Sequence, residues 1–549
     1  MAKGFLVSYA GYPYTPSSLT PDNGLANLAG ALIRDGHEVR VIDYGTTDLM
    51  RRLMPQEHGE RLRTIYRGLT GQRHSVLGSL RKIYYLMALR RRDRVLSALH
   101  RLEVDRIVGE LSCLLESEKA NFVGFKLWNG DGIEGAIRMA ERLRRDHPYL
   151  QLLAGGPHVD LFQERILDIT DAFDCLVYAE GEHVICDVVA RAVEGRDFDG
   201  IPNVIFRKNG HVVKTPAVWI EDLNSLPLPV YEPNVYPGVR DKKIRIAVID
   251  ESRGCPYGCN FCIQPIKSGS KIRAKSPDRV LQEIQALVNV HDIRTFKYAG
   301  STTPAKLMLA VARLICEQQL RVRYSAFAEA NMVHPEDLAY LRDSGLESLF
   351  YGLESGNQGL LDNVFDKKLK KERIAEALVA TKKAGIFTVA SVIFPAPGET
   401  AETRRETLEF LLDVRPDSVP VQFPGVFPGT AWFLDHDRFN ISLDKEAYMD
   451  AALRYKIKLL YPPRFWSKLP YTVDGKSFRI VTRETEAFVR DLEHNEILVG
   501  VPDDMFLLSR LTGIEPKELR DKCREWFYCG DVEAIDELVE LANRGQANG

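Results

Sequence analysis

Three cysteines within one ten-residue segment are the residues whose types and spacing indicate the clearest chemistry. Cys255, Cys259 and Cys262 lie in RGCPYGCNFC with the spacing Cys-x-x-x-Cys-x-x-Cys, and no fourth cysteine is nearby. The glycines and the proline of this segment suit a loop that wraps a compact group. A structural zinc site takes four protein ligands, whereas three thiolates leave one iron of a [4Fe–4S] cluster open to a small molecule. The spacing predicts such a cluster, and a zinc-site fragment is the alternative.

The segment around this loop has the pattern of a partial β/α barrel. Six apolar strands alternate with amphipathic helices between residues 244 and 430. Six β/α units predict a partial barrel of the TIM type, with its chemistry at the carboxyl ends of the strands. The cysteine loop follows the first of these strands, IRIAVIDES, where such a barrel would place a reactive group.

The first 200 residues alternate continuous apolar strands with helices, which predicts a parallel sheet covered on both faces. In such a doubly wound sheet the ligand lies beyond the carboxyl ends of the strands. Small or turn-forming residues follow these strands and would let the backbone approach a large ligand. The candidate ligand-binding residues there are Asn129, Gly155, Gly156, His158, Glu180 and Gly181.

The same alternation divides the chain into four parts and predicts an α/β fold class. We expect a doubly wound, Rossmann-like domain over residues 1–200, with a helical insertion at about 49–119. We expect a hairpin and a proline-rich linker over residues 201–240. We expect the barrel over residues 241–432. Residues 433–549 form a mostly helical C-terminal domain that we expect to cap the substrate. The basic run LRRRDR in the insertion is typical of a solvated helix face, with an anion-binding surface as the alternative.

Length, composition and charge favour a globular protein over a nucleic-acid-binding, membrane-spanning or secreted one. The 549 residues suffice for about three or four domains, and 45% of them are hydrophobic, as in ordinary globular proteins. The net charge of −3 gives no general attraction for nucleic acid. No stretch approaches the ~20 apolar residues of a membrane span, and the N-terminus lacks the apolar run of a signal peptide. Six further cysteines are scattered singly, as expected of buried thiols in a reducing cytoplasm, where we place the protein.

The cysteine motif, with the aromatic Phe261 before its third cysteine, resembles that of the radical S-adenosylmethionine (SAM) superfamily. YGLESG, FPAPGET and VFPGT at later strand ends are similar to segments of the same superfamily. The resemblance implies that the open iron binds SAM, which is reductively cleaved to a 5′-deoxyadenosyl radical, with flavodoxin or ferredoxin as the electron donor. It also implies SAM contacts at or near five residues, although YAGST replaces the frequent Gly-Gly-Glu. The five are Tyr298, Ser301, Glu329, Glu354 and Ser355; for Glu329 a solvated carboxylate is the alternative.

The first half of the chain resembles the cobalamin-binding members of that superfamily, through AGGPH, AEGE and GLANLAGALIRDGHEVRVIDY. The resemblance covers about residues 4–430 and implies that the strand-end residues named above hold cobalamin. The Asp-x-His-x-x-Gly signature that supplies a lower histidine to cobalt elsewhere is absent. Cobalamin would therefore bind base-off, and His158 would contact the corrin side chains or the tail rather than cobalt.

The resemblance as a whole implies a cobalamin-dependent radical SAM methyltransferase. Such an enzyme transfers a methyl group from SAM, by way of methylcobalamin, to a weakly nucleophilic carbon of a small-molecule intermediate, as in secondary metabolism. Tyr461, Arg464, Phe465 and Trp466 in the C-terminal domain are candidates to close over the substrate and exclude water, or else form that domain's own core.

Three alternatives stay open from the sequence. The same architecture also supports cyclisation, ring contraction or oxidation without methyl transfer. An RNA-modifying methylthiotransferase would need further cluster cysteines in front and a basic tail behind, and neither is present. A sensor that binds cobalamin without catalysis would not need an intact cysteine triad.

Overall fold

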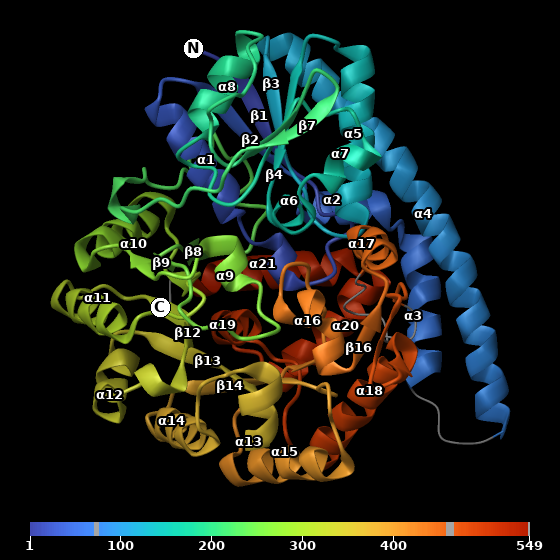
Figure 1. Ribbon diagram of the computed structural model, residues 1–549, viewed down its shortest axis with the longest axis vertical. Helices are drawn as coiled ribbons and strands as arrows, with labels where there is room; N and C mark the ends of the chain where they lie inside the picture. Colours follow the sequence, from blue (N-terminus) through green and yellow to red (C-terminus); the bar gives the residue numbers. More distant parts are fainter. Residues whose placement is uncertain (71–75, 457–465, 547–549) are drawn as a thin grey trace.

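The computed structural model describes residues 1–70, 76–456 and 466–546, and most of its strands lie in two large sheets, one mixed and one parallel (Figure 1). One sheet belongs to the N-terminal part of the chain and the other to the middle part. The carboxyl ends of the first sheet face the second sheet across a seam. This arrangement confirms the α/β fold class.

The first sheet has seven strands in the order β2-β1-β3-β4-β5-β6-β7. Its five parallel strands are those that the apolar runs predict: β1 Lys3–Ser8, β2 Glu38–Asp43, β3 Phe122–Lys126, β4 Gln151–Gly155 and β5 Cys175–Val177. The hairpin β6 (Val204–Lys208) and β7 (His211–Lys214) pairs antiparallel with β5. The hairpin that we assigned to the linker therefore extends the first sheet.

The two faces of the first sheet pack into two different hydrophobic cores. Leu6 and Leu153 belong to a core that continues into the second sheet, whereas their neighbours Phe5 and Leu152 belong to a core shared with the C-terminal helices. Since side chains alternate across a strand, continuous apolar runs are required to fill both cores. Helices cover both faces: α1 Asn23–Arg34, α5 Asp131–Asp146, α6 Pro157–Phe162, α7 Arg165–Ile169 and α8 Ile185–Val193.

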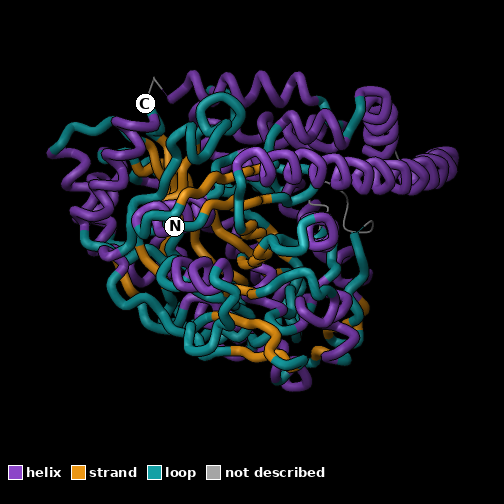
Figure 2. Tube along the Cα trace, turned by 90° about the horizontal axis from the view of Figure 1, so that it is seen from above, coloured by secondary structure: helices purple, strands orange, loops and turns teal. Residues whose placement is uncertain are grey.

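The insertion after β2 is helical, as expected, and consists of α2 Thr47–Leu53, α3 Gln56–Thr70 and α4 Val76–Glu118. Helix α4 is 43 residues long and extends beyond the rest of the molecule (Figure 2). Its C-terminal half packs on α5, and α3 packs on α20 of the C-terminal region.

The second sheet has six parallel strands in the order β15-β14-β13-β12-β11-β8, which confirms the six-unit partial barrel. The strands are β8 Ile246–Ile249, β11 Thr295–Tyr298, β12 Arg323–Ala328, β13 Leu346–Glu354, β14 Phe387–Ile393 and β15 Val421–Gln422. Their outer helices are α10 Pro277–His291, α11 Ala305–Glu317, α12 Pro335–Asp343, α14 Lys371–Lys383 and α15 Ala401–Val414.

The C-terminal region packs on both halves of the molecule. Helix α19 (Asp503–Thr512) lies against β12 and β13. There, Ser325 donates to Asp503 at 2.9 Å, and the rings of Phe387 and Phe506 stack at 3.8 Å. Helix α17 (Lys445–Leu453) reaches α6 of the first domain. The remaining elements are α16 Ala431–Leu434, β16 Ile441–Leu443, β17 Tyr471–Val473, β18 Lys476–Ser477, α18 Phe478–His494, α20 Pro516–Cys529 and α21 Val532–Gly545.

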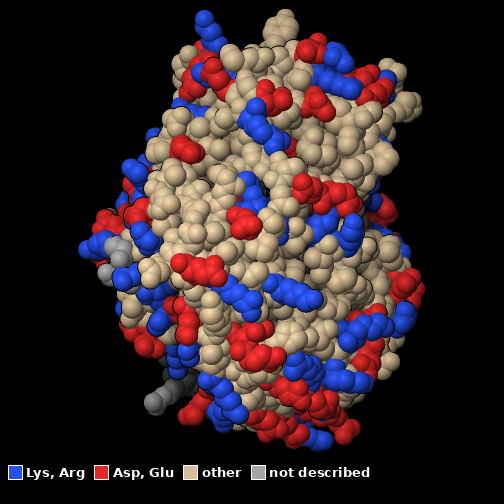
Figure 3. Space-filling view, turned by 90° about the vertical axis from the view of Figure 1, so that its left-hand side faces the viewer, with Lys and Arg blue, Asp and Glu red and all other residues tan. Residues whose placement is uncertain are grey.

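The cysteines outside the loop divide between core and surface. Cys175, Cys523 and Cys529 are buried, as predicted, whereas Cys113 is exposed on α4, which corrects the expectation for that thiol. Acidic and basic side chains are interspersed on the face of the molecule shown in Figure 3. Within the described part of the chain, the helices are too short or too polar for one of them to traverse a bilayer.

A buried ion-pair network joins the two domains. Both guanidinium Nη atoms of Arg273 donate to the carboxylate of Glu180 at 2.8 Å, and both side chains are about 5% exposed or less. Arg253 joins Glu182 at 2.6 Å and Asp250 at 2.7 Å. Because Glu180 and Glu182 follow β5 while both arginines lie on the small ribbon β9 (Ser252–Arg253) and β10 (Arg273–Ala274), the network fixes the first sheet against the barrel.

The change Arg273→Met should show the contribution of this network to stability. It removes the bidentate partner of the buried Glu180 carboxylate and leaves only the Arg253 guanidinium at 3.5 Å, so we expect the free energy of unfolding to fall by about 3–5 kcal/mol in a denaturant titration at pH 7. Lys271→Met is the matched control, because Lys271 pairs with Glu221 at the surface, where both side chains are more than two-thirds exposed. An equal loss in both variants would contradict this role of the buried pair.

Candidate functional site

The cysteine loop lies between β9 and the short helix α9 (Gln264–Ser268), at the carboxyl end of the barrel. Gly254 begins the loop with a φ of 85°, and a Cβ at this position would come within 2.1 Å of the Lys271 carbonyl oxygen. Only glycine fits there. The Cys255 amide donates to the Gly269 carbonyl at 3.1 Å, which closes the loop at its other end.

The loop is held from beneath by aromatic packing and main-chain hydrogen bonds. Phe261 packs between Phe365 and Trp432, with ring centroids 5.6 and 5.7 Å away. The Asn260 amide donates to the Phe365 carbonyl, and the Trp432 amide donates to the Asn260 carbonyl, both at 3.0 Å. The aromatic residue of the motif is therefore part of the anchor that fixes the loop to the barrel.

The three thiols of the loop are free and partly buried. Burial raises the pKa of each thiol, and that of Cys259 to about 12. Bound metal would have to supply the positive charge that makes them thiolates. No three His, Cys, Asp or Glu side chains among the described residues are arranged around a single metal ion. Three loop thiolates fit a [4Fe–4S] cluster with one iron left open, whereas a structural zinc site takes four protein ligands.

A buried lysine that the sequence did not point to lies beside this loop. The ammonium of Lys367 is 2.9 Å from the Glu329 carboxylate and 3.7 Å from that of Glu354, and both Lys367 and Glu354 are 5% exposed. Although burial opposes its charge, the two carboxylates raise the pKa of Lys367. Burial raises the pKa of Glu354 to about 7. Lys367 and Glu354 also act electrostatically on Cys259 and Cys262, so this group and the cysteine loop form one site.

The other residues predicted to contact SAM differ in whether their side chains face the site or the core. Ser355 is buried beside Glu354, and its hydroxyl lies 3.2 Å from that of Thr407. The Tyr298 side chain is 1% exposed and packs against Phe296 and Tyr324 in the core. Only its main chain, followed by the segment that leads to Ser301, is therefore near the site.

Glu251, which sequence reasoning missed, holds the segment after β11. Its carboxylate accepts hydrogen bonds from the amides of Ala299 and Gly300 at 3.0 Å and from the Thr303 hydroxyl at 2.9 Å. The side chain is fully buried, and burial raises its pKa to about 7. No periodic signal in the sequence marks this carboxylate, because its partners lie about 50 residues away.

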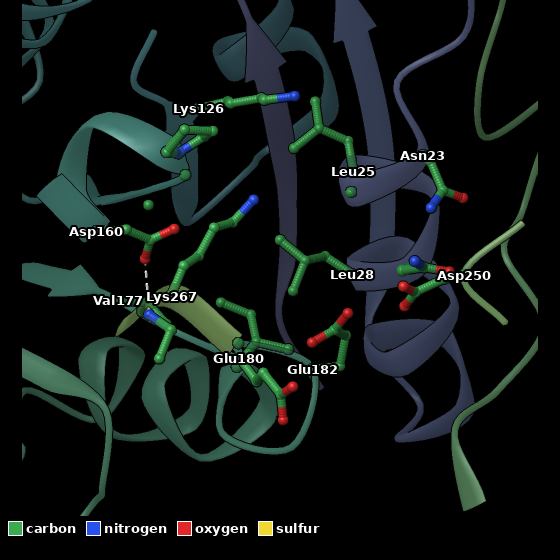
Figure 4. Close-up of a pocket in the computed structure, with 18 of the residues that line it drawn as sticks. Asn23, Leu25, Leu28, Lys126, Asp160, Val177, Glu180, Glu182, Asp250 and Lys267 are labelled. Carbon is green, nitrogen blue, oxygen red and sulfur yellow. Dashed lines mark hydrogen bonds between the residues drawn. The ribbon is translucent and has the colours of Figure 1, made fainter. Parts of the chain in front are cut away.

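A cavity of about 360 Å³ lies in the seam between the two domains. Its walls come from the carboxyl edge of the first sheet, from α1 and α8, and from the barrel segments beside the cysteine loop (Figure 4). Predicted residues at its wall are Gly155, Gly156, Glu180, Gly181 and Ser301; residues that the sequence did not single out include Asn23, Leu28, Lys126, Asp160, Asp250 and Lys267. The structure thus brings the strand-end glycines and the barrel to one cavity.

Two of the predicted strand-end residues do not line this cavity. The Asn129 carbonyl accepts the amide of Gly132 in the first turn of α5. His158 is buried, and its Nε2 lies 2.8 Å from the Leu453 carbonyl of α17, so its ring links the first domain to the C-terminal region. Desolvation lowers the pKa of His158.

Of the four aromatic and basic residues expected to close over the substrate, Tyr461, Arg464 and Phe465 lie outside the described residues. Trp466 packs against Phe423, with 5.6 Å between ring centroids. Phe423 follows the last barrel strand, so Trp466 lies near that end of the barrel. That Trp466 caps the substrate stays a prediction.

Comparisons with known proteins show a family match for the middle of the chain. Residues 251–411 match the Radical SAM superfamily family model. A methyltransferase of Pyrococcus horikoshii, PH0819, whose role is uncharacterised, is 22% identical over 349 residues, 63% of this chain and 76% of the relative. The anaerobic magnesium-protoporphyrin IX monomethyl ester cyclase of Rubrivivax gelatinosus is 28% identical over 331 residues. That match spans 57% of this chain and 59% of the cyclase.

The fold as a whole also has a solved counterpart. The radical SAM methyltransferase TsrM of Kitasatospora setae, in a structure with cobalamin and a [4Fe–4S] cluster bound, superimposes with a TM-score of 0.65. The superposition covers 96% of this chain and all of TsrM at 16% identity. Residues 251–411 therefore match the radical SAM superfamily, and the chain as a whole has the fold of TsrM.

Proposed function

We propose that this protein is a cobalamin-dependent radical SAM methyltransferase that methylates a weakly nucleophilic carbon of a small-molecule biosynthetic intermediate. The observation that supports this most is the cavity in the seam, because it connects the carboxyl edge of the first sheet with the barrel edge that carries the cysteine loop. A cofactor in the seam would face the cluster side of the barrel.

The residues of the barrel edge fit a cluster and SAM. Cys255, Cys259 and Cys262 would ligate three irons, and the fourth iron would take SAM. Glu354 and Ser355 at the end of β13 would orient SAM, with the main chain before Ser301 at the other side. When bound, the reduced cluster supplies the electron that cleaves SAM, and cobalamin carries the methyl group.

The first sheet fits cobalamin through the small residues at its edge. A Cβ on Gly155 would lie 3.1 Å from the Val177 carbonyl oxygen, and one on Gly156 would lie 3.1 Å from the Lys126 side chain. Gly156 also has a φ of 98°, which side chains rarely permit. Glycine therefore brings bare backbone to the wall of the cavity, as a large planar ligand needs.

The chain's own charged groups would order the reaction centre. Lys367 holds Glu329 and Glu354 beside the cysteine loop, and the ion pairs of Arg253 and Arg273 keep the cavity wall in register with the loop. Burial of these groups limits the water that reaches a radical.

Cyclisation without methyl transfer is the second candidate, because the cyclase relative matches 28% of aligned residues. A methyltransferase would add one methylene to the substrate's mass and release both 5′-deoxyadenosine and S-adenosylhomocysteine. A cyclase would release 5′-deoxyadenosine without S-adenosylhomocysteine.

Anaerobic reconstitution with iron, sulfide and hydroxocobalamin, followed by incubation with SAM and a reductant, tests the proposal. We expect cobalt to bind at about one per chain and both SAM-derived products to accumulate with a candidate substrate. S-adenosylhomocysteine should depend on cobalamin. Protein that binds no cobalt, or that forms only 5′-deoxyadenosine with an unmethylated product, would overturn the methyltransferase assignment.

Each of the three loop cysteines should be needed for the cluster. In Cys255→Ala, Cys259→Ala and Cys262→Ala we expect the iron and sulfide content to fall to background and the cubane signal in electron paramagnetic resonance to disappear. Cys113→Ala is the matched control, since its thiol is exposed on α4, and it should retain the full content. A zinc-loaded protein with an intact loop would refute the cluster.

Lys367→Met should destabilise the protein in a pH-dependent way. Because the pKa of Glu354 is raised from 4.5 to about 7, the folded state holds a proton that the unfolded state loses over this range. Stability from this group therefore falls as pH rises. Without Lys367 we expect a loss of about 3–5 kcal/mol at pH 8 and a smaller one at pH 5, where Glu354 is protonated.

The neighbouring Lys368, which pairs with Asp366 at the surface, provides the control. Lys368→Met should leave the denaturant midpoint unchanged at both pH values. A loss in Lys367→Met that did not vary with pH would point to packing rather than to the two carboxylates.

A further inference from the structure

The charged groups that line the seam cavity are almost all paired. Lys126 binds Asp22 at 2.5 Å, Glu180 binds Arg273, and Arg253 binds Glu182 and Asp250. Asp160 accepts the Ala179 amide at 2.7 Å (Figure 4). Among the described residues, Lys267 alone of the lining cations has no ion-pair or hydrogen-bond partner for its side chain.

Lys267 lies where two cavities meet. A second cavity, of about 440 Å³, adjoins the first and is lined by Tyr178 and by the segment from Lys214 to Trp219 at the end of the hairpin. Asp160, Ala179 and Lys267 line both cavities. Figure 4 shows the lysine side chain extending into the seam cavity between Asp160 and Leu28. Although burial opposes the change, Arg253 and then Lys275 lower the pKa of Asp250, with a lesser contribution from the Lys267 ammonium. Among the described residues, no ion pair joins Lys267 to Asp250 or Asp160.

An ammonium in such a place is suited to an anionic ligand. A half-enclosed charge without a partner loses part of its hydration, and a ligand anion restores that loss through a charge-assisted hydrogen bond. The SAM carboxylate does not fit this position, because none of the cluster cysteines, Glu329 or Glu354 lines either cavity. The anion must belong to the molecule that fills the seam.

This step rests on the proposed function. Cobalamin carries one anionic group, the phosphodiester that joins the corrin to its nucleotide tail, while its ring side chains are neutral amides. We infer that Lys267 binds the phosphodiester of cobalamin and so fixes the nucleotide tail at the junction of the two cavities. Lys267 is therefore a residue that selects the complete corrinoid over one without a phosphate.

The test compares three corrinoids with the reconstituted wild-type protein and Lys267→Gln. Cobalamin has phosphate and nucleoside, cobinamide phosphate has the phosphate alone, and cobinamide has neither. Dissociation constants come from absorbance titration and equilibrium dialysis, without turnover. We expect Lys267→Gln to weaken cobalamin and cobinamide phosphate by about tenfold or more, and cobinamide by less than about twofold.

Two further variants serve as controls for the loss of the Lys267 charge. Lys271→Gln removes a charge from the same segment outside the cavities, where its partner is Glu221, and should leave all three affinities unchanged. Lys267→Arg keeps the charge and should retain the preference for the phosphate-bearing ligands, and higher salt should reduce that preference in the wild type.

The outcomes separate this inference from the proposed function. Equal weakening of all three corrinoids would place Lys267 against the ring and overturn the phosphodiester assignment, as would unchanged affinities. Weakening of cobalamin without weakening of cobinamide phosphate would assign the lysine to the nucleoside and would also overturn it. If the wild type binds none of the three, the proposed function fails and the inference fails with it.

Discussion

Two buried ion pairs, Glu180 with Arg273 and Glu182 with Arg253, link the first sheet to the barrel. They join the strand end of β5 to the ribbon β9–β10, and Arg253 lies two residues before Cys255. Ion pairs that are removed from water tolerate little displacement, because a carboxylate without its partner is costly to bury. The distance between the first sheet and the cysteine loop is therefore set by charge pairing as well as by apolar packing.

The same ion pairs border the seam cavity, since Glu180, Glu182 and Arg253 line it. Glycines at the strand ends keep the wall free of side chains, and the paired charges make it largely neutral. Lys267, whose ammonium has no partner within the described part of the chain, distinguishes one part of the wall from the rest.

The barrel side of the seam is organised around a second buried charge. Lys367 gathers Glu329 and Glu354 next to the thiols, and Phe261 and Trp432 fix the loop from below. Burial raises the pKa of each of the three thiols, so bound iron would have to supply the positive charge that makes them thiolates.

Local pattern in the sequence was enough to predict the parallel strands, the six β/α units and the cysteine loop, because these depend on periodicity and on spacing within a few residues. The glycines at 155, 156 and 181 were recognisable for the same reason. Tertiary structure alone decided which strand-end residues face the cavity: His158 turns to the Leu453 carbonyl, and the Tyr298 side chain enters the core. It also decided the pairing of Glu180 with Arg273 and of Lys367 with Glu329, whose partners are 93 and 38 residues apart. The pattern of side chains along one helix or strand indicates which face of that element is buried. It does not indicate which distant charged residue will form an ion pair with a residue on that face.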